Sequence, residues 1–268
     1  MVRDKVLSWI NKTGFPLEME AAKAFRNAGF EVRQSATHLD PEEQKGREID
    51  VLAQDPDWMG VVDIYFVVEC KSSDKPWVVL MADDVLSNFS RIHSFAVTSE
   101  DAKSEMFSIW RNNEDFKDLL NKPARCGYSF RQALGGKNDH AYSAAISVLK
   151  ACAGLTRERT ASVLKRFAFA LPVIVVDTPI FECTLNFDGE IELVEVQESS
   201  FLFSAHMPDE VACCIKVIRK EELQEFTLGA KEIADSIRQF MKGSERATIE
   251  SVSSPNKSKK KEAEPPPL

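Results

Sequence analysis

The spacing of apolar and polar residues in the first part of the chain predicts two helices followed by three strands. Apolar residues at three- and four-residue steps indicate an amphipathic helix from Leu17 that ends at Gly29, a residue type that commonly follows a helix. The later apolar run is nearly continuous, which is typical of a strand covered on both faces. The expected elements are helices at 4–11 and 17–29 and strands at 30–36, 47–53 and 61–71.

Beyond residue 71 the pattern moves between helical and strand-like segments. Thr156 is predicted to cap a helix, and Asp188 with Gly189 is typical of a hairpin turn. A short apolar segment lies at 77–81. Helices are expected at 83–92, 102–111, 114–120, 142–152, 154–169, 221–226 and 230–242. Strands are expected at 95–98, 172–176, 180–186, 190–197, 200–204 and 213–218.

These elements predict an α/β protein with a central mixed sheet flanked by helices. Residues 1–176 are expected to form the α/β core with a helical insertion. Residues 177–243 are expected to be a β-rich C-terminal extension with a helix, which either continues the sheet or forms an appended portion. Residues 244–268 turn to Ser, Lys, Glu and Pro and are expected to be a disordered tail. The lysine-rich stretch 257–261 in that tail is either a solvated segment or a weak nucleic-acid or targeting element.

Composition limits the classes of function. The 268 residues are 44% hydrophobic and 28% charged, which is ordinary for a soluble globular protein. The net charge of −8 argues against a protein that coats nucleic acid non-specifically. It allows a nuclease, because an acidic metal site lowers the total while a cleft can be locally basic. Residues 117–166 are rich in Lys and Arg and form either a solvated helical surface or a surface that faces nucleic acid.

Cysteine usage and hydropathy indicate a cytoplasmic protein that does not cross a membrane. The six cysteines have no spacing typical of zinc sites and lie mostly in apolar surroundings, as expected for buried, reduced thiols. The longest apolar run, at 167–176, is too short for a membrane span and contains Pro172. Asp4 and Lys5 stand where a signal peptide would begin its apolar core.

Charged residues inside strand-forming sequence are the candidate chemistry. Alternate side chains of a strand share a face, so Glu69 and Lys71 are expected to project together while the Cys70 side chain points to the opposite face. Asp50 ends the neighbouring strand, and its carboxylate can approach that of Glu69 if the two strands pair. Two close carboxylates repel each other unless a cation lies between them, and their hard oxygen atoms suit Mg²⁺ or Mn²⁺.

Such a site predicts hydrolysis of phosphodiester bonds. A divalent ion polarises a phosphoryl oxygen and lowers the pKa of bound water, and a lysine beside it orients water or counters negative charge. Acyl transfer would instead need a Ser or Cys beside a His. Glu18 lies on the apolar side of its helix with Ala21 and Phe25, whereas Glu20 points outward.

A helix with an inward Glu18, then Ile49-Asp50, then Glu69-Cys70-Lys71 on a strand resembles the PD-(D/E)XK nuclease superfamily, which has the restriction-endonuclease-like fold. Within it, the chain is most similar to Mrr-type restriction endonucleases and archaeal Holliday-junction resolvases. The similarity covers residues 17–77. Ile49 stands where the motif that names the superfamily has Pro, and the auxiliary Gln or Lys of some members is unassigned.

The resemblance implies a role for each motif residue. Asp50 and Glu69 would be metal ligands, with the Cys70 carbonyl completing the shell, Lys71 the catalytic lysine and Glu18 an outer acid for a second metal or a water. It implies an Mg²⁺-dependent endonuclease, with Mn²⁺ as a substitute, that cuts DNA rather than RNA. A homodimer is compatible with it, since enzymes of this fold that cut both strands often pair. The rival interpretations are an inactive member that binds nucleic acid or protein, and a structural domain with coincidental acids.

Overall fold

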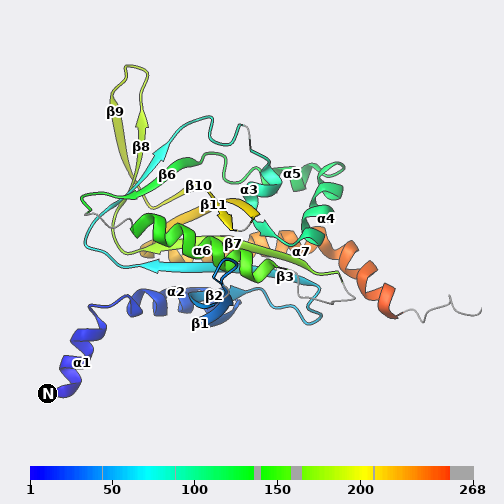
Figure 1. Cartoon of the computed structure of the whole chain (residues 1–268), viewed down its shortest axis with the longest axis horizontal. Helices are drawn as coiled ribbons and strands as arrows, with labels where there is room; N and C mark the ends of the chain where they lie inside the picture. Colours follow the sequence, from blue (N-terminus) through cyan, green and yellow to red (C-terminus); the bar gives the residue numbers. More distant parts are fainter. Residues whose placement is uncertain (44, 88, 136–139, 158–164, 208, 254–268) are drawn as a thin grey trace, which may run out of the picture.

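Strands rich in Val, Ile and Phe pair into one 11-stranded mixed sheet among the described residues (Figure 1). The computed structural model describes residues 1–43, 45–87, 89–135, 140–157, 165–207 and 209–253. The strands are β1 (Glu31–Leu39), β2 (Gly46–Gln54), β3 (Val62–Lys71), β4 (Trp77–Met81), β5 (Val97–Thr98), β6 (Gly127–Gln132), β7 (Phe167–Val176), β8 (Ile180–Leu185), β9 (Ile191–Val196), β10 (Glu198–Met207) and β11 (Asp209–Arg219). The helices are α1 (Val2–Ile10), α2 (Phe15–Asn27), α3 (Arg91–Phe95), α4 (Glu100–Trp110), α5 (Glu114–Leu120), α6 (His140–Thr156), the 3₁₀ turn η1 (Lys220–Glu222) and α7 (Leu223–Ser253).

Strands from both halves of the chain alternate across the sheet. The order is β1-β2-β3-β7-β11-β10-β6-β4-β8-β9, with β5 pairing to β7 beside this path. β1, β2 and β3 form an antiparallel meander, and β3, β7 and β11 are parallel to one another. The strands after residue 176 therefore extend the sheet and do not form an appended portion, because β11 pairs directly with β7. The expected α/β class with a mixed sheet and flanking helices is confirmed.

The neighbouring interior strands β3 and β7 are buried along almost their whole length. β3 and β7 pair in parallel over ten positions, and every residue of β7 is buried. The continuous apolar run at 61–71 correctly predicted such a strand. Pro172 is tolerated inside β7 because one edge of this strand pairs with β5 up to Ala170 and with β11 from Val173, which leaves the proline between the two ladders.

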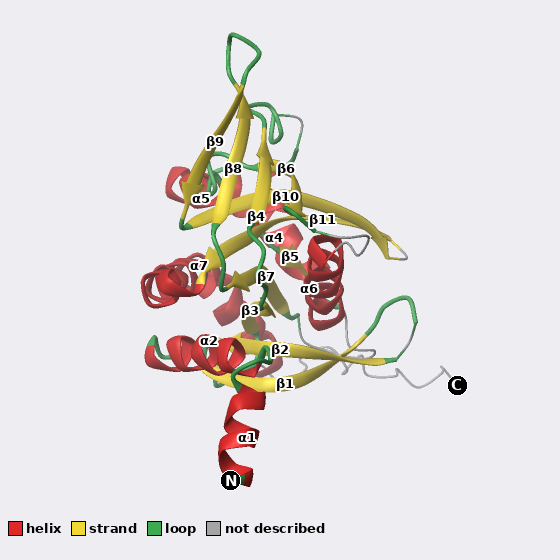
Figure 2. Ribbon diagram, turned by 90° about the vertical axis from the view of Figure 1, so that its left-hand side faces the viewer, coloured by secondary structure: helices red, strands yellow, loops and turns green. Residues whose placement is uncertain are grey.

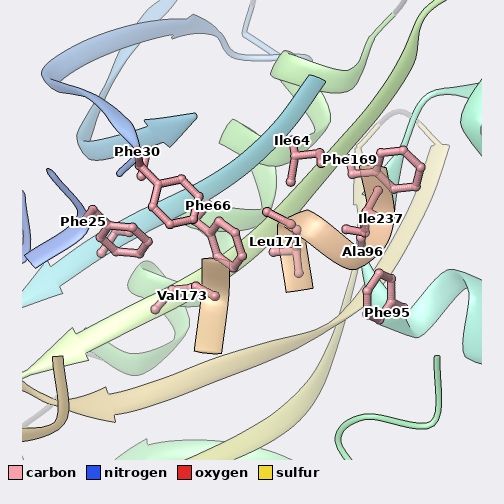
Figure 3. Close-up of a cluster of buried hydrophobic side chains, with 14 of the residues drawn as sticks. Phe25, Phe30, Ile64, Phe66, Phe95, Ala96, Phe169, Leu171, Val173 and Ile237 are labelled. Carbon is pink, nitrogen blue, oxygen red and sulfur yellow. The ribbon is translucent and has the colours of Figure 1, made fainter. Parts of the chain in front are cut away.

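Helices cover both faces of the sheet. Helices α2 and α7 lie on one face and α6 lies on the other (Figure 2). On the first face Phe25 of α2 and Phe30 pack against Phe66 of β3, with ring centroids 5.8 and 5.4 Å from that of Phe66 (Figure 3). On the second face, small residues of α6 such as Ala144 and Ala145 are completely buried against the sheet. The strand pair β2–β3 is thus held between two helical layers.

The first helices and strands lie close to their expected positions, whereas the middle of the chain differs. Residues 83–87 form turns instead of the expected helix, and β6 was not predicted. The expected helix at 154–169 is wrong at both ends. Thr156 is the last residue of α6, where its hydroxyl donates to the Cys152 carbonyl, and β7 begins at Phe167. Residues 158–164 of that prediction lie outside the described part of the chain.

The last helix is longer than its sequence predicts. Helix α7 is continuous through Gly229 and Gly243 to Ser253, so residues 244–253 are helical and are not part of a disordered tail. Its buried side is completed by Thr248, which is 7% exposed. This favourable packing outweighs the intrinsic preference of the two glycines for non-helical backbone, about 1 kcal/mol each. The rest of the predicted tail, 254–268, lies outside the described residues.

Candidate active site

Asp50 and Glu69 lie at the point where strands β2 and β3 stop pairing. The antiparallel ladder between these strands ends at Val51 opposite Val68, so Asp50 and Glu69 are the next residue on each strand. The Asp50 side chain takes the place of the missing ladder, because its Oδ2 accepts a hydrogen bond of 2.8 Å from the backbone N–H of Cys70. The carboxylate of Asp50 is therefore fixed between the two strands.

A local irregularity in β1 and β2 lies beside this opening. The β1–β2 ladder pairs the residues on either side of Ser35 and Asp50 but not these two with each other. Ser35 has a φ of 51°, a left-handed conformation that is unfavourable for serine. Val51 packs on the face covered by α2 and α7, and regular alternation would put Ile49 on that same face. Ile49 instead packs on the face covered by α6. Such strain is maintained where the surroundings fix it, often at functional sites.

Glu69 is held by two neighbours on the α6 face of the sheet. Its side chain is 10% exposed, and its Oε1 lies 2.6 Å from the Nζ of Lys71. Ser147 of α6 donates a hydrogen bond of 3.0 Å to the other carboxylate oxygen. Cys70 between them packs on the opposite face with the residues under α2 and α7. Glu69 and Lys71 therefore share one face and the Cys70 side chain does not, as the alternation predicts.

The Cys70 carbonyl is aimed at the same opening as Asp50. In an extended strand the N–H and C=O of one residue point to the same side. Because the Cys70 N–H donates to Asp50, its carbonyl oxygen also faces β2, beyond the last pair of the β2–β3 ladder. This backbone oxygen is a third hard donor beside the carboxylates of Asp50 and Glu69.

Glu18 reaches the site from helix α2. It is half-buried, whereas Glu20 is exposed, which agrees with their expected positions on the helix. Burial raises the pKa of Glu18, and the negative charges of Asp50, Glu48 and Glu69 raise it further. The helix thus brings a third carboxylate into the field of the two strand acids.

The site carries more negative than positive charge. Burial raises the pKa values of Asp50 and Glu69, and the pKa of Glu69 is raised further by the charge of Asp50. Burial opposes the ammonium of Lys71, but Glu69 and Asp50 outweigh it and raise the pKa of Lys71. One lysine therefore faces several carboxylates, and an added cation would relieve their repulsion.

The oxygen donors of this site are of the type that binds a hard divalent cation, but they are few. Two carboxylates and one backbone carbonyl are oxygen ligands of the type that Mg²⁺ and Mn²⁺ prefer. Within the described residues, no group of three or more His, Cys, Asp or Glu side chains is arranged to hold a metal ion. A divalent ion here would therefore keep several waters and would compete with Lys71 for Glu69.

Two further residues at this end of the sheet were not predicted. Asp177 follows β7 and holds the loop after β3, since it accepts hydrogen bonds from the Ser72 hydroxyl and, at 2.9 Å, from the Ser73 backbone N–H. The sequence could have indicated Asp177, because it directly follows a predicted strand and the carboxyl ends of parallel strands meet at one edge of a sheet. Ser147 gave no such signal, since it lies in a largely apolar helix and acts only through the packing of α6 on β3.

Two basic residues of the 117–166 stretch pair with acids inside the fold. Lys150 of α6 binds Asp40 at 3.1 Å and Glu42 at 2.5 Å. Arg166 donates to Asp63 at 2.6 Å. These two cations stabilise the packing of α6 and the start of β7. Lys137 and Arg159 lie outside the described residues, so both interpretations of the stretch as a whole stay predictions.

Comparisons of the chain with protein-family models, curated proteins and solved structures find no match. None of the helices in the described part of the chain is both long enough and apolar enough to cross a lipid bilayer. The class that fold and geometry define is thus an α/β protein with a mixed sheet and an acidic, lysine-containing site where β2 and β3 separate.

Proposed function

We propose that this chain is a metal-dependent nuclease that hydrolyses phosphodiester bonds in DNA and has a restriction-endonuclease-like core. The observation that carries the proposal is the meeting of Asp50, Glu69 and Lys71 where β2 and β3 separate, with Glu18 approaching from α2. Residues that are far apart in the sequence converge in the order that the PD-(D/E)XK resemblance implies. Their excess negative charge supports a cation as the missing partner.

The chain's own groups have separable roles in this reaction. Asp50, Glu69 and the Cys70 carbonyl would hold Mg²⁺, which supplies Lewis-acid polarisation of a phosphoryl oxygen and a more acidic water. Lys71, whose side chain is 30% exposed, can stabilise negative charge on the phosphate with its ammonium. Ser147 fixes the rotamer of Glu69, and the Cys70 N–H fixes that of Asp50.

The direct test is cleavage of supercoiled plasmid, linear duplex, single-stranded DNA and RNA with millimolar Mg²⁺ or Mn²⁺. We expect Asp50→Asn, Glu69→Gln and Lys71→Met each to lower the rate at least about 100-fold, since removing one stabilising group at such a site has effects of this size. Glu20→Gln is the matched control, because Glu20 is an exposed acid on the same helix as Glu18. Full activity in any of the three folded variants would refute the proposal.

The ion pair between Lys71 and Glu69 favours one second candidate, an inactive member of this fold that binds nucleic acid or protein. Lys71 already neutralises Glu69 at 2.6 Å, so the arrangement is electrostatically satisfied in part without metal. Calorimetric titration with Mn²⁺ separates the candidates. A nuclease should release or absorb heat that is lost in Asp50→Asn and Glu69→Gln, whereas the inactive module should give no metal-dependent heat.

A further inference from the structure

Two cysteine sulfur atoms lie in contact on the sheet face opposite to the core that contains Cys213. The Sγ atoms of Cys126 and Cys214 are 3.4 Å apart, although the residues are separated by 88 positions in the sequence. Cys214 belongs to β11, and Cys126 is the last residue of the loop before β6. Both pack with Leu86 in a small apolar cluster of their own. The fold therefore places two free thiols side by side.

The surroundings of this pair favour reaction at Cys214. The contact between the Cys126 and Cys214 sulfur atoms lowers the pKa of Cys214, and the Arg91 guanidinium lowers it further against the effect of burial. A cavity of ≈ 80 Å³ lies beside the pair and is lined by Cys126, Leu86, Arg91 and Arg125. Such a cavity admits a molecule as small as hydrogen peroxide to Cys126, and the sulfur of Cys214 lies 3.4 Å behind that contact without lining the cavity itself.

The other buried cysteines lack these features. Cys213, the neighbour of Cys214 in β11, is fully buried on the opposite face and donates to the Ser94 carbonyl at 3.4 Å. Cys152 of α6 is also fully buried, and burial raises the pKa of both thiols. Within the described residues, a sulfur–sulfur contact beside a cavity and a cation is found at this pair, with Cys126 and Arg91 lining the cavity.

We propose that Cys126 and Cys214 form an oxidisable dithiol site that hydrogen peroxide converts into a disulfide. In the first step the Cys214 thiolate attacks one peroxide oxygen, an S–O bond forms, the O–O bond breaks, and the released hydroxide takes a proton to become water. In the second step the Cys126 sulfur attacks the sulfenic acid, an S–S bond forms, the S–O bond breaks, and a second water leaves with the Cys126 proton. Two thiols lose two electrons, and one peroxide becomes two waters.

The change of structure that this reaction needs is small. A disulfide requires sulfur atoms about 2.05 Å apart, so the present contact of 3.4 Å must shorten by a little more than 1 Å. Cys126 lies outside the regular strand, and β6 pairs with β10 only at Gly127 opposite Phe201. The loop that carries Cys126 is thus the part that moves. The inference is independent of the proposed nuclease site, which lies on β2 and β3.

The test is oxidation of the full chain by hydrogen peroxide, followed by alkylation and peptide mass spectrometry without reduction. We expect one linked peptide joining Cys126 to Cys214, a fall from six to four titratable thiols in denaturant, and full reversal by dithiothreitol. In Cys126→Ser we expect no linked peptide and a sulfenic acid at Cys214 that dimedone traps. Cys152→Ser is the matched control and should form the same linked peptide as the unchanged chain.

Mapping in the unchanged chain decides the proposal even if a variant fails to fold. Absence of the linked peptide while circular dichroism remains native would overturn it, as would linkage of any other pair. Equal dimedone labelling at all six cysteines would show general oxidation and would also overturn it.

Discussion

Replacing Asp55 tests how helix α7 is fastened over the strands that carry the candidate site. Asp55 follows β2, and its side chain is only 1% exposed. Its carboxylate binds Lys231 of α7 at 2.5 Å. It also binds Arg238, which lies about two helical turns further along α7. Both cations come from α7, so this single acid connects the last helix to the β2–β3 turn.

The size of the effect follows from burial and partner number. Hydrogen bonds to charged groups contribute about 1.5–3 kcal/mol each. Lys231 and Arg238 are 32% and 25% exposed, so both recover part of their solvation after Asp55 is removed. We therefore take the lower end for each bond and expect Asp55→Ala to reduce the free energy of unfolding by about 3 kcal/mol.

Asp235 provides a matched control on the same lysine. It binds Lys231 at 2.8 Å but is 62% exposed. Exposed pairs of this kind contribute about 0.5 kcal/mol or less, so Asp235→Ala should have a small effect. The assay is equilibrium unfolding in urea followed by circular dichroism, with the dependence on denaturant unchanged between variants. Equal losses for Asp55→Ala and Asp235→Ala, or a loss below about 1 kcal/mol for Asp55→Ala, would refute the reasoning.

Two further predictions concern the contact between α6 and the β1–β2 hairpin. Burial opposes the charge of Asp40, but backbone N–H groups and Lys150 outweigh it and lower the pKa of Asp40 from 3.8 to about 2. Its contribution, on the order of 2 kcal/mol, is therefore present above pH 4 and lost as pH falls through 2; Asp40→Asn should abolish this acid dependence in unfolding titrations. Gly154→Ala would place a Cβ 2.8 Å from the carbonyl oxygen of Leu39 and should destabilise by about 1–3 kcal/mol. As the control, Gly229→Ala in α7 would place a Cβ with nothing within 4 Å and should raise the free energy of unfolding by about 0.5–1 kcal/mol. If both glycine substitutions changed the free energy of unfolding in the same direction, the close approach of α6 to Leu39 would be contradicted.

Some features of the candidate site were predictable from strand alternation, and others depend on how the strands pair. Alternation along one strand placed Glu69 and Lys71 on one face and Cys70 on the other, because strand geometry is local. The hydrogen bond from the Cys70 N–H to Asp50 was not predictable, because it forms where the β2–β3 ladder ends, next to the unpaired, left-handed Ser35 in β1. The irregularity has no counterpart in the spacing of apolar residues.

The sequence by itself determined the local elements of the first part of the chain, the double burial of β3 and the end of α2 just before Gly29, whose φ is 92°. These follow from periodicity and from backbone freedom, which are properties of neighbouring residues. Tertiary structure alone decided that β7 and β11 would join β3, that Ser147 would bind Glu69 and that α7 would run through two glycines. Those outcomes arise from burial of distant apolar faces against one another, and that free energy outweighs the local preferences that a sequence pattern reveals.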